Sequence, residues 1–226
     1  MSDSDSDSEF SKSWVEWFMS LKGNEFFCEV DDDYILDFFN LTGLNAEINC
    51  FQQALELITD SLEKYDENMV NQIEKSAKEL YGLIHARYIL TNRGLMKMQE
   101  KHRKKDFGLC LRANCYNNPL LPVGLSDTHK KAVVALYCGC CEDIYRVKQS
   151  KHKSVDGAYF GTTFPHLFYD SFPGLKSRIV DPEPSKLRYV PKIFGFKVHD
   201  IANIHRWQDK HVERENSRIA KMLENS

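Results

Sequence analysis

The sequence predicts an α+β fold: an all-helical N-terminal domain, then a β domain of the zinc-ribbon type held by four cysteines, then a C-terminal hairpin and tail. Apolar residues recur at helical spacing up to about residue 105. Beyond that point, two close pairs of cysteines lie beside short segments that alternate between apolar and polar residues. We therefore expect a disordered Ser/acidic tail, a helical domain, a zinc-ribbon domain, a linker with a hairpin, and a charged tail, at 1–12, 13–105, 106–165, 166–200 and 201–226.

The composition allows a sizeable core and argues against several classes of protein. A length of 226 residues suits one large or two small domains, and the 42% of residues that are hydrophobic are enough for a core. A net charge of -3 favours neither nucleic acid nor a membrane as the partner. The N-terminus alternates Ser and Asp, unlike a signal peptide, and no apolar run is long enough to span a bilayer. We expect a cytoplasmic and nuclear protein with reduced cysteines.

Helix signals begin directly after the acidic tail. Residues 13–16 have the Ser-x-x-Glu pattern of a capping box, and aromatic residues follow at helical spacing until Gly23 ends the helix. The three aspartates at 31–33 suit the positive end of a second helix. Apolar spacing predicts a third helix over 51–58, and the polar residues at 59–68 predict a loop.

The longest helix is expected at about 70–91, because apolar residues from Ile73 to Tyr88 lie along one face. Asn92–Gly94 would break this helix, and a basic helix over 95–105 would lead into the cysteine region. His85 lies within the long helix. We interpret it as a core or interface histidine rather than a catalytic one.

Four cysteines predict a structural metal site. Cys110 and Cys115 enclose four residues, and Cys138 and Cys141 enclose two. Two such loops on hairpins can bring four thiolates to the corners of a tetrahedron, the arrangement of a closed zinc site without a position for water. We assign Cys141 rather than Cys140 as the fourth ligand, because a two-residue gap lets backbone N–H groups point back at the first sulfur. The zinc would hold the fold rather than catalyse a reaction; unliganded cysteines or a disulfide are the weaker alternative.

The sequence gives no sign of catalysis. It has no glycine-rich phosphate loop, no nucleophile elbow and no His-Glu-x-x-His pattern, so we expect a protein that is not itself an enzyme. Two basic runs, at 97–105 and 146–153, could contact phosphates beside a zinc ribbon, but no aromatic residues are interleaved for base stacking. We favour a solvated surface, with a nucleic-acid-binding zinc ribbon as an alternative function.

Both ends of the chain carry candidate interaction segments. Ser2, Ser4 and Ser6 each precede an acidic residue by three positions, so an acidophilic kinase would accept them, although a merely solubilising tail fits the composition equally well. After a Pro-rich stretch, residues 188–199 alternate like a short hairpin around Gly195. This hairpin could complete a sheet or dock on another protein, and the residues alone leave both open. The residues from 200 onward could be helical but have no continuous apolar stripe.

Several blocks of sequence, in this order, carry a resemblance to a known family. They are GNEFFCEVDDDYI, NLTGLN, YGLIHARYILTNRG, GLSD, DGAYFGT and GFK, at 23–35, 40–45, 81–94, 124–127, 156–162 and 195–197. Together with the four-cysteine pattern, they closely resemble the regulatory β subunit of casein kinase II over about residues 14–200.

The resemblance implies a role for each part of the chain. In this family a helical domain precedes a zinc ribbon, and the ribbon forms the contact of a β–β homodimer, so the run AVVALY (132–137) would partly face the second chain. The N-terminal serines would be targets of autophosphorylation. The family's C-terminal hairpin docks on the catalytic α subunit. In this sequence the docking residues correspond to Ile193, Phe194, Phe196 and Lys197.

We therefore expect a non-catalytic regulatory subunit that binds one structural zinc ion per chain and forms a tetramer of two α and two β chains. It would bind and stabilise the catalytic α subunit and modulate its choice of Ser/Thr substrates. A β-like adaptor without a kinase partner is the alternative. Phe194 stands where the family usually has tyrosine, which would remove one hydrogen bond worth about 1 kcal/mol.

Overall fold

Helices fill the N-terminal part of the chain and a small sheet follows them, as the α+β prediction requires. The computed structural model describes residues 12–62, 69–112, 115–176, 192–199 and 203–224. The chain forms two units, an N-terminal unit at 1–179 and a C-terminal unit at 180–226. The predicted phosphorylation sites, Ser2, Ser4 and Ser6, lie outside the described residues, and so does 63–68 of the predicted loop.

The first helices begin where the sequence predicts them. In α1 (Trp14–Ser20), the Glu16 N–H donates to Ser13 Oγ at 3.2 Å and the Ser13 N–H donates back to the Glu16 carboxylate at 3.3 Å, which completes the capping box. The helix α2 (Asp32–Leu36) starts within the run of aspartates, and α3 (Phe51–Ile58) has the predicted bounds. Two short 3-10 helices, η1 (Phe38–Leu41) and η2 (Leu44–Ala46), connect α2 to α3.

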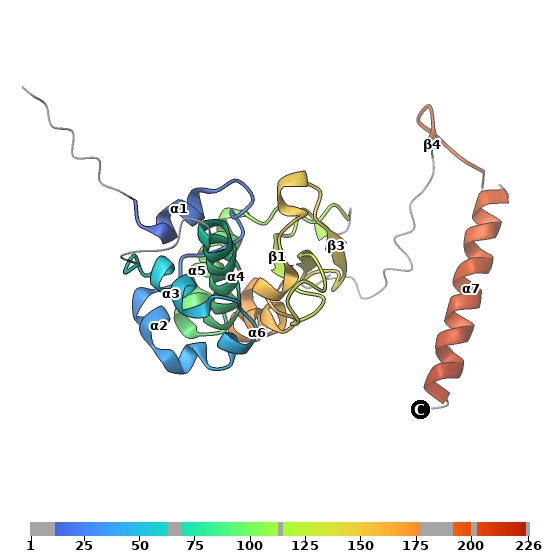
Figure 1. Cartoon of the computed structure of the whole chain (residues 1–226). Helices are drawn as coiled ribbons and strands as arrows, with labels where there is room; N and C mark the ends of the chain where they lie inside the picture. The colour runs from blue at the N-terminus through green and yellow to red at the C-terminus, as the bar shows by residue number, and fades with distance from the viewer. Residues whose placement is uncertain (1–11, 63–68, 113–114, 177–191, 200–202, 225–226) are drawn as a thin grey trace, which may run out of the picture. The chain divides into compact units, whose positions relative to one another are not determined.

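The helix α4 (Val70–Tyr88) packs against α3, and the other helices of this half gather around it (Figure 1). It ends earlier than predicted, and Asn92–Gly94 does not interrupt it. These residues instead form the first turn of α5 (Asn92–Lys104), because the hydroxyl of Thr91 accepts a hydrogen bond from the Gly94 N–H at 3.2 Å and caps the helix. Glycine is required at 94, where a Cβ would lie 2.1 Å from the Tyr88 carbonyl oxygen.

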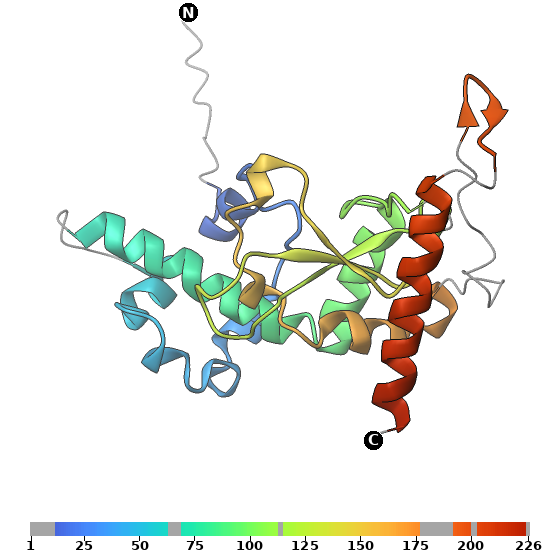
Figure 2. The same cartoon turned by 90° about the vertical axis from the view of Figure 1, so that its right-hand side faces the viewer.

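The strands β1 (Leu120–Val123), β2 (Ala135–Cys138) and β3 (Ile144–Arg146) form one antiparallel sheet in the order β1-β2-β3. Both β1 and β2 are buried along their full length, whereas β3 is partly exposed. The helix α6 (Phe164–Ser171) packs on β1 and lies beside the sheet in both views (Figures 1 and 2). The linker expected from residue 166 therefore starts later, because the buried Phe164 and Phe168 hold α6 against the sheet.

One hydrophobic core joins the helical residues to those of the sheet. His85 lies fully buried at this junction: its Nε2 accepts from the Cys28 N–H at 3.1 Å, and its Nδ1 lies 2.8 Å from the Tyr159 carbonyl oxygen. These two partners define a neutral imidazole that donates through Nδ1. Burial lowers the pKa of His85 to about 4. The prediction of a core histidine is confirmed.

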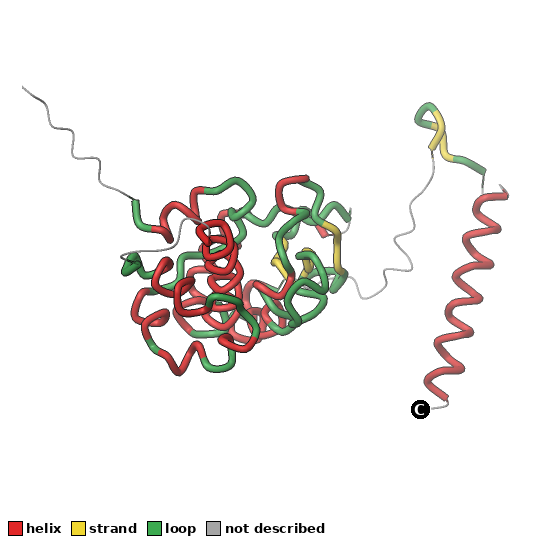
Figure 3. The backbone as a smooth tube through the Cα atoms, viewed as in Figure 1, coloured by secondary structure: helices red, strands yellow, loops and turns green. Residues whose placement is uncertain are grey.

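The C-terminal unit contains a hairpin of β4 (Lys192–Ile193) and β5 (Phe196–Lys197) and one helix, α7 (Asn203–Glu224). At 22 residues, α7 is longer than α4 with 19, so the expectation that the helix starting at residue 70 is the longest was wrong. Figure 3 shows this succession of helices, sheet, hairpin and final helix. Among the described residues, no helix combines the length and the apolar character needed to cross a bilayer.

Candidate metal centre and hairpin

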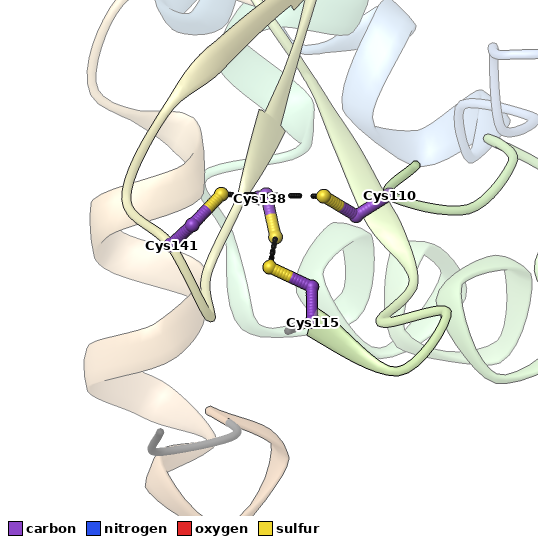
Figure 4. A group of neighbouring side chains, drawn as sticks. All are labelled: Cys110, Cys115, Cys138 and Cys141. Atoms are coloured by element: carbon purple, nitrogen blue, oxygen red, sulfur yellow. Dashed lines mark hydrogen bonds between the residues drawn. The ribbon is translucent and has the colours of Figure 1, made fainter. Parts of the chain in front are cut away.

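The structure brings the four predicted cysteines together, with their sulfur atoms pointing toward one another (Figure 4). The sulfurs of Cys110 and Cys141 lie 4.0 Å apart, and so do those of Cys138 and Cys115. All four sulfurs lie within 4.8 Å of one another. The first three residues are buried and Cys141 is partly buried. The group is therefore small, nearly closed to solvent, and composed of sulfur alone.

The spacing of the sulfurs fits a tetrahedral metal ion. Four sulfurs placed about 2.3 Å from a central ion lie roughly 3.8 Å from one another. The observed pairs at 4.0 Å are close to this separation, so a small contraction would complete the coordination. A cluster of four thiolates suits a soft or borderline metal. Because every position would be taken by protein sulfur, the group leaves no site for a reacting water.

Backbone geometry positions the second pair of cysteines. Cys138 ends β2, and the chain then turns so that the Glu142 N–H donates to the Cys138 carbonyl oxygen at 2.8 Å. The N–H groups of Cys140 and Cys141 donate toward the Cys138 sulfur, as the two-residue gap predicts. Cys140 is not part of the four-sulfur group among the described residues. The loop thus contributes Cys141 as the ligand and Cys140 as a neighbour.

Hydrogen-bond donors near the sulfur of Cys141 favour its thiolate form. Burial alone would raise the pKa of Cys141, but the Tyr145 hydroxyl, 3.1 Å from its sulfur, and the Asp143 N–H lower that pKa to about 7. Burial raises the pKa of Cys138 to about 11, and it also raises the pKa of Cys115. Four cysteines this close and this buried would all be thiolates only with a cation between them.

Sequence reasoning missed the side chains that surround the cysteines. Tyr145 reaches Cys141 from β3, and the Asn118 amide donates to the Cys138 sulfur at 3.5 Å. Arg112 hydrogen-bonds to the Cys141 sulfur and pairs with Asp143 at 3.4 Å. These residues follow no motif. The only local signal was that each lies within a few positions of a cysteine.

The predicted docking residues all lie on the β4–β5 hairpin. Ile193 pairs with Phe196 across the hairpin, and Phe194 and Gly195 form its two-residue turn. Both turn residues have positive φ, 49° and 86°, as in a type I′ turn. Phe194 is 97% exposed, Phe196 80% and Ile193 62%. Within the described residues, β4 and β5 pair with each other in a two-stranded antiparallel sheet.

A helical segment that shares its core with a ribbon carrying a closed four-sulfur group defines a class of protein. In such proteins a metal held by the four sulfurs stabilises the fold. The chain belongs to the casein kinase II regulatory subunit family, because the model of that family matches residues 13–197. The match contains the four cysteines and the hairpin, and α7 lies beyond it.

Curated relatives agree with the family assignment. The chain is 51% identical over 217 residues to casein kinase II subunit beta of Schizosaccharomyces pombe, with 96% of this chain and 92% of the relative covered. It is 50% identical over 220 residues to casein kinase II subunit beta-2 of Neurospora crassa, covering 97% and 75%. It is 45% identical over 204 residues to casein kinase II subunit beta' of Drosophila melanogaster, covering 89% of each chain.

Proposed function

We propose that this chain is a zinc-stabilised, homodimeric regulatory subunit that binds a casein kinase II catalytic subunit through its C-terminal hairpin. Regulatory subunits of casein kinase II form the family to which the chain belongs. In this proposal the chain carries out no chemistry. It holds the catalytic subunit in a stable complex and modulates which Ser/Thr substrates, in acidic contexts, are phosphorylated.

The zinc ion would be held by Cys110, Cys115, Cys138 and Cys141. Zinc is favoured because it prefers tetrahedral sulfur coordination without a redox role, and the spacing of the sulfurs suits its bond length. Its contribution is structural. It would neutralise four thiolates and fix the end of β2 relative to Cys110 and Cys115, which positions the sheet.

The homodimer contact would form on the exposed face of the ribbon. Four apolar residues of this segment are well exposed and available for such a contact: Leu111, Leu125, Val133 and Ile144. Most of the run AVVALY (132–137) is instead buried within the chain's own core, with Val133 as its exposed apolar residue. A second copy that covers these side chains would remove apolar surface from water, worth about 25 cal/mol per Å².

The hairpin carries the proposal most directly. It presents three exposed apolar side chains from a well-formed turn, although burying them would be favourable. Phe194 also occupies a left-handed backbone conformation, with φ at 49°, that costs a bulky residue about 1 kcal/mol or more. A strained aromatic tip beside a second aromatic is the type of anchor that fills a pocket on a partner. Lys197 would add a charged contact at the edge.

Calorimetric titration with a casein kinase II catalytic subunit tests the proposal. The wild-type chain should bind one catalytic subunit per chain, and Phe194→Ala/Phe196→Ala should weaken binding at least a hundredfold, since truncating two anchors costs about 2 kcal/mol or more each. The matched control is Phe38→Ala/Phe39→Ala, which removes two phenylalanines that are 71% and 83% exposed in the N-terminal unit. Equal affinity for both double variants would refute the docking role. No binding by a folded wild-type dimer would favour an adaptor without a kinase partner.

Two further parts of the proposal concern regulation and location. We propose that Ser2, Ser4 and Ser6 are phosphorylated by the assembled kinase, because each precedes an acidic residue by three positions. We also propose that the protein acts in the cytoplasm and nucleus. Mass spectrometry of the complex after incubation with ATP would place phosphate on the N-terminal segment if the first proposal is right.

A further inference from the structure

A cavity of about 860 Å³ lies between the helical segment and the ribbon of the N-terminal unit. The cavity is lined mainly by the loop at 24–27, the segment at 105–111 and the chain from β3 to His152. Its lining includes apolar side chains from both segments: Phe26, Phe107, Leu120, Leu136 and Val147. This volume is within the range of cavities that hold small organic ligands, about 300–1,000 Å³.

The charge around the cavity is opposite to that of the whole chain. Five Lys/Arg side chains and two carboxylates line it, a local balance of +3, whereas the chain carries -3. Lys101 pairs with Asp106 at 3.5 Å, and Lys151 pairs with Glu25. The other three cations have no acidic partner in the part of the chain that the structure describes. They are Lys105, Arg146 and Lys148.

A buried histidine beside the cavity has one nitrogen without a partner. His152 is 3% exposed, its ring stacks on Phe26 with the centroids 4.0 Å apart, and its Nε2 lies 2.7 Å from a Glu25 carboxylate oxygen. Its Nδ1 is buried and has no hydrogen-bond partner among the described residues. A buried polar atom without a partner costs free energy, and His152 itself is one of the residues that line the cavity.

We propose that this cavity binds a small organic anion with an apolar body, such as a medium-chain or long-chain carboxylate. The negative head would lie against Lys105, Arg146 and Lys148, and the apolar body would cover the phenylalanine and aliphatic side chains of the lining. This is a ligand-binding function separate from subunit docking, and it does not depend on the proposed hairpin contact.

The cavity lies next to the metal group and to the proposed dimer contact. Cys110 lines it, so the cavity adjoins the four-sulfur group, and it bridges the helical segment and the ribbon. Leu111, one of the residues proposed for the homodimer contact, also lies at its edge. A second copy of the chain is therefore the competing occupant, and the experiment must separate it from a small anion.

Binding can be measured on the full-length, zinc-loaded protein with anilinonaphthalene sulfonate, a fluorescent anion with an apolar aromatic body. We expect saturable binding at one probe per chain, displaced by decanoate but far more weakly by decanol of equal length. Along the series hexanoate, octanoate and decanoate, each added methylene should tighten binding about threefold to fourfold, because it buries more apolar surface.

Two matched triple variants test the site. Lys105→Gln/Arg146→Gln/Lys148→Gln should weaken decanoate binding about tenfold or more, because each exposed cation contributes a modest charge interaction and the three add. Lys75→Gln/Arg103→Gln/Lys131→Gln removes the same charges from exposed positions outside the cavity and should leave binding unchanged. Equal weakening by both variants, or no dependence on chain length, would overturn the proposal. Binding that appears only at dilutions that dissociate the dimer would assign the cavity to the second copy instead.

Discussion

Replacing one sulfur of the metal group should weaken zinc binding by two to three orders of magnitude. Structural zinc in small domains is worth about 10–16 kcal/mol at neutral pH. Shared equally over four sulfurs, this gives about 2.5–4 kcal/mol per cysteine, or roughly 100- to 1,000-fold in affinity. Cys141→Ser tests this value, and Cys140→Ser is the matched control, because Cys140 is adjacent in sequence but outside the group.

The same change should lower the stability of the fold. A ligand that binds only the folded state stabilises it in proportion to the logarithm of its concentration over Kd, so a hundredfold loss of affinity removes about 2.7 kcal/mol at saturating zinc. For a protein of this size that corresponds to a fall of about 5–10 °C in Tm. The effect should reach the helical half, because the sheet that the cysteines hold shares the core with α4 and α6.

Competition with a chromophoric zinc chelator measures the affinity, and thermal unfolding at matched zinc concentration measures the stability. Cys141→Ser should release zinc to the chelator and unfold at lower temperature, whereas Cys140→Ser should behave as the wild type. Zinc retention by both variants, or an equal loss from both, would refute the assignment of ligands.

Three further predictions concern the core and the hairpin. Burial lowers the pKa of His85 to about 4, so the stability from its neutral form is present above pH 6.5 and is lost as the pH falls toward 4. Urea unfolding should therefore show a free energy of unfolding about 1 kcal/mol lower at pH 5.5 than at pH 7.5, and His85→Gln should lack this loss. Equal losses in the two proteins would contradict the assignment. Gly94→Ala places a Cβ 2.1 Å from the Tyr88 carbonyl oxygen. It should therefore destabilise by about 2 kcal/mol or more in urea despite alanine's better helix propensity, and a gain in stability would contradict the close approach. Phe194→Tyr should tighten binding to the catalytic subunit about fivefold in calorimetry by restoring one hydrogen bond worth about 1 kcal/mol, and unchanged affinity would show that the hydroxyl has no partner.

Features coded by neighbouring residues could be predicted from the sequence. The capping box at Ser13 and Glu16 and the apolar spacing of α3 both act over one or two helical turns, so their patterns gave the correct starts. The grouping of the cysteines could also be predicted, because the two-residue gap between Cys138 and Cys141 lets backbone N–H groups point back at the Cys138 sulfur. The short distances in sequence made these predictions reliable.

Features that depend on tertiary contacts could not be predicted in this way. Gly94 suggested a helix break, but the Thr91 hydroxyl caps α5 there and the glycine instead allows close approach to Tyr88. The predicted linker begins at residue 166, within α6, because the aromatic residues of this helix become informative only once β1 lies beneath them. The cavity beside His152 joins residues from opposite ends of the unit, and no sequence pattern connects Phe26 to Val147.

Native mass spectrometry of the full-length chain, mixed with a casein kinase II catalytic subunit, tests the central proposal most directly. It counts zinc ions, regulatory chains and catalytic subunits in the same particle. The proposed function predicts a complex of two copies of this chain, two zinc ions and two catalytic subunits. A zinc-loaded dimer that excludes the catalytic subunit would contradict the docking role, and a zinc-free complex would contradict the role of the four cysteines.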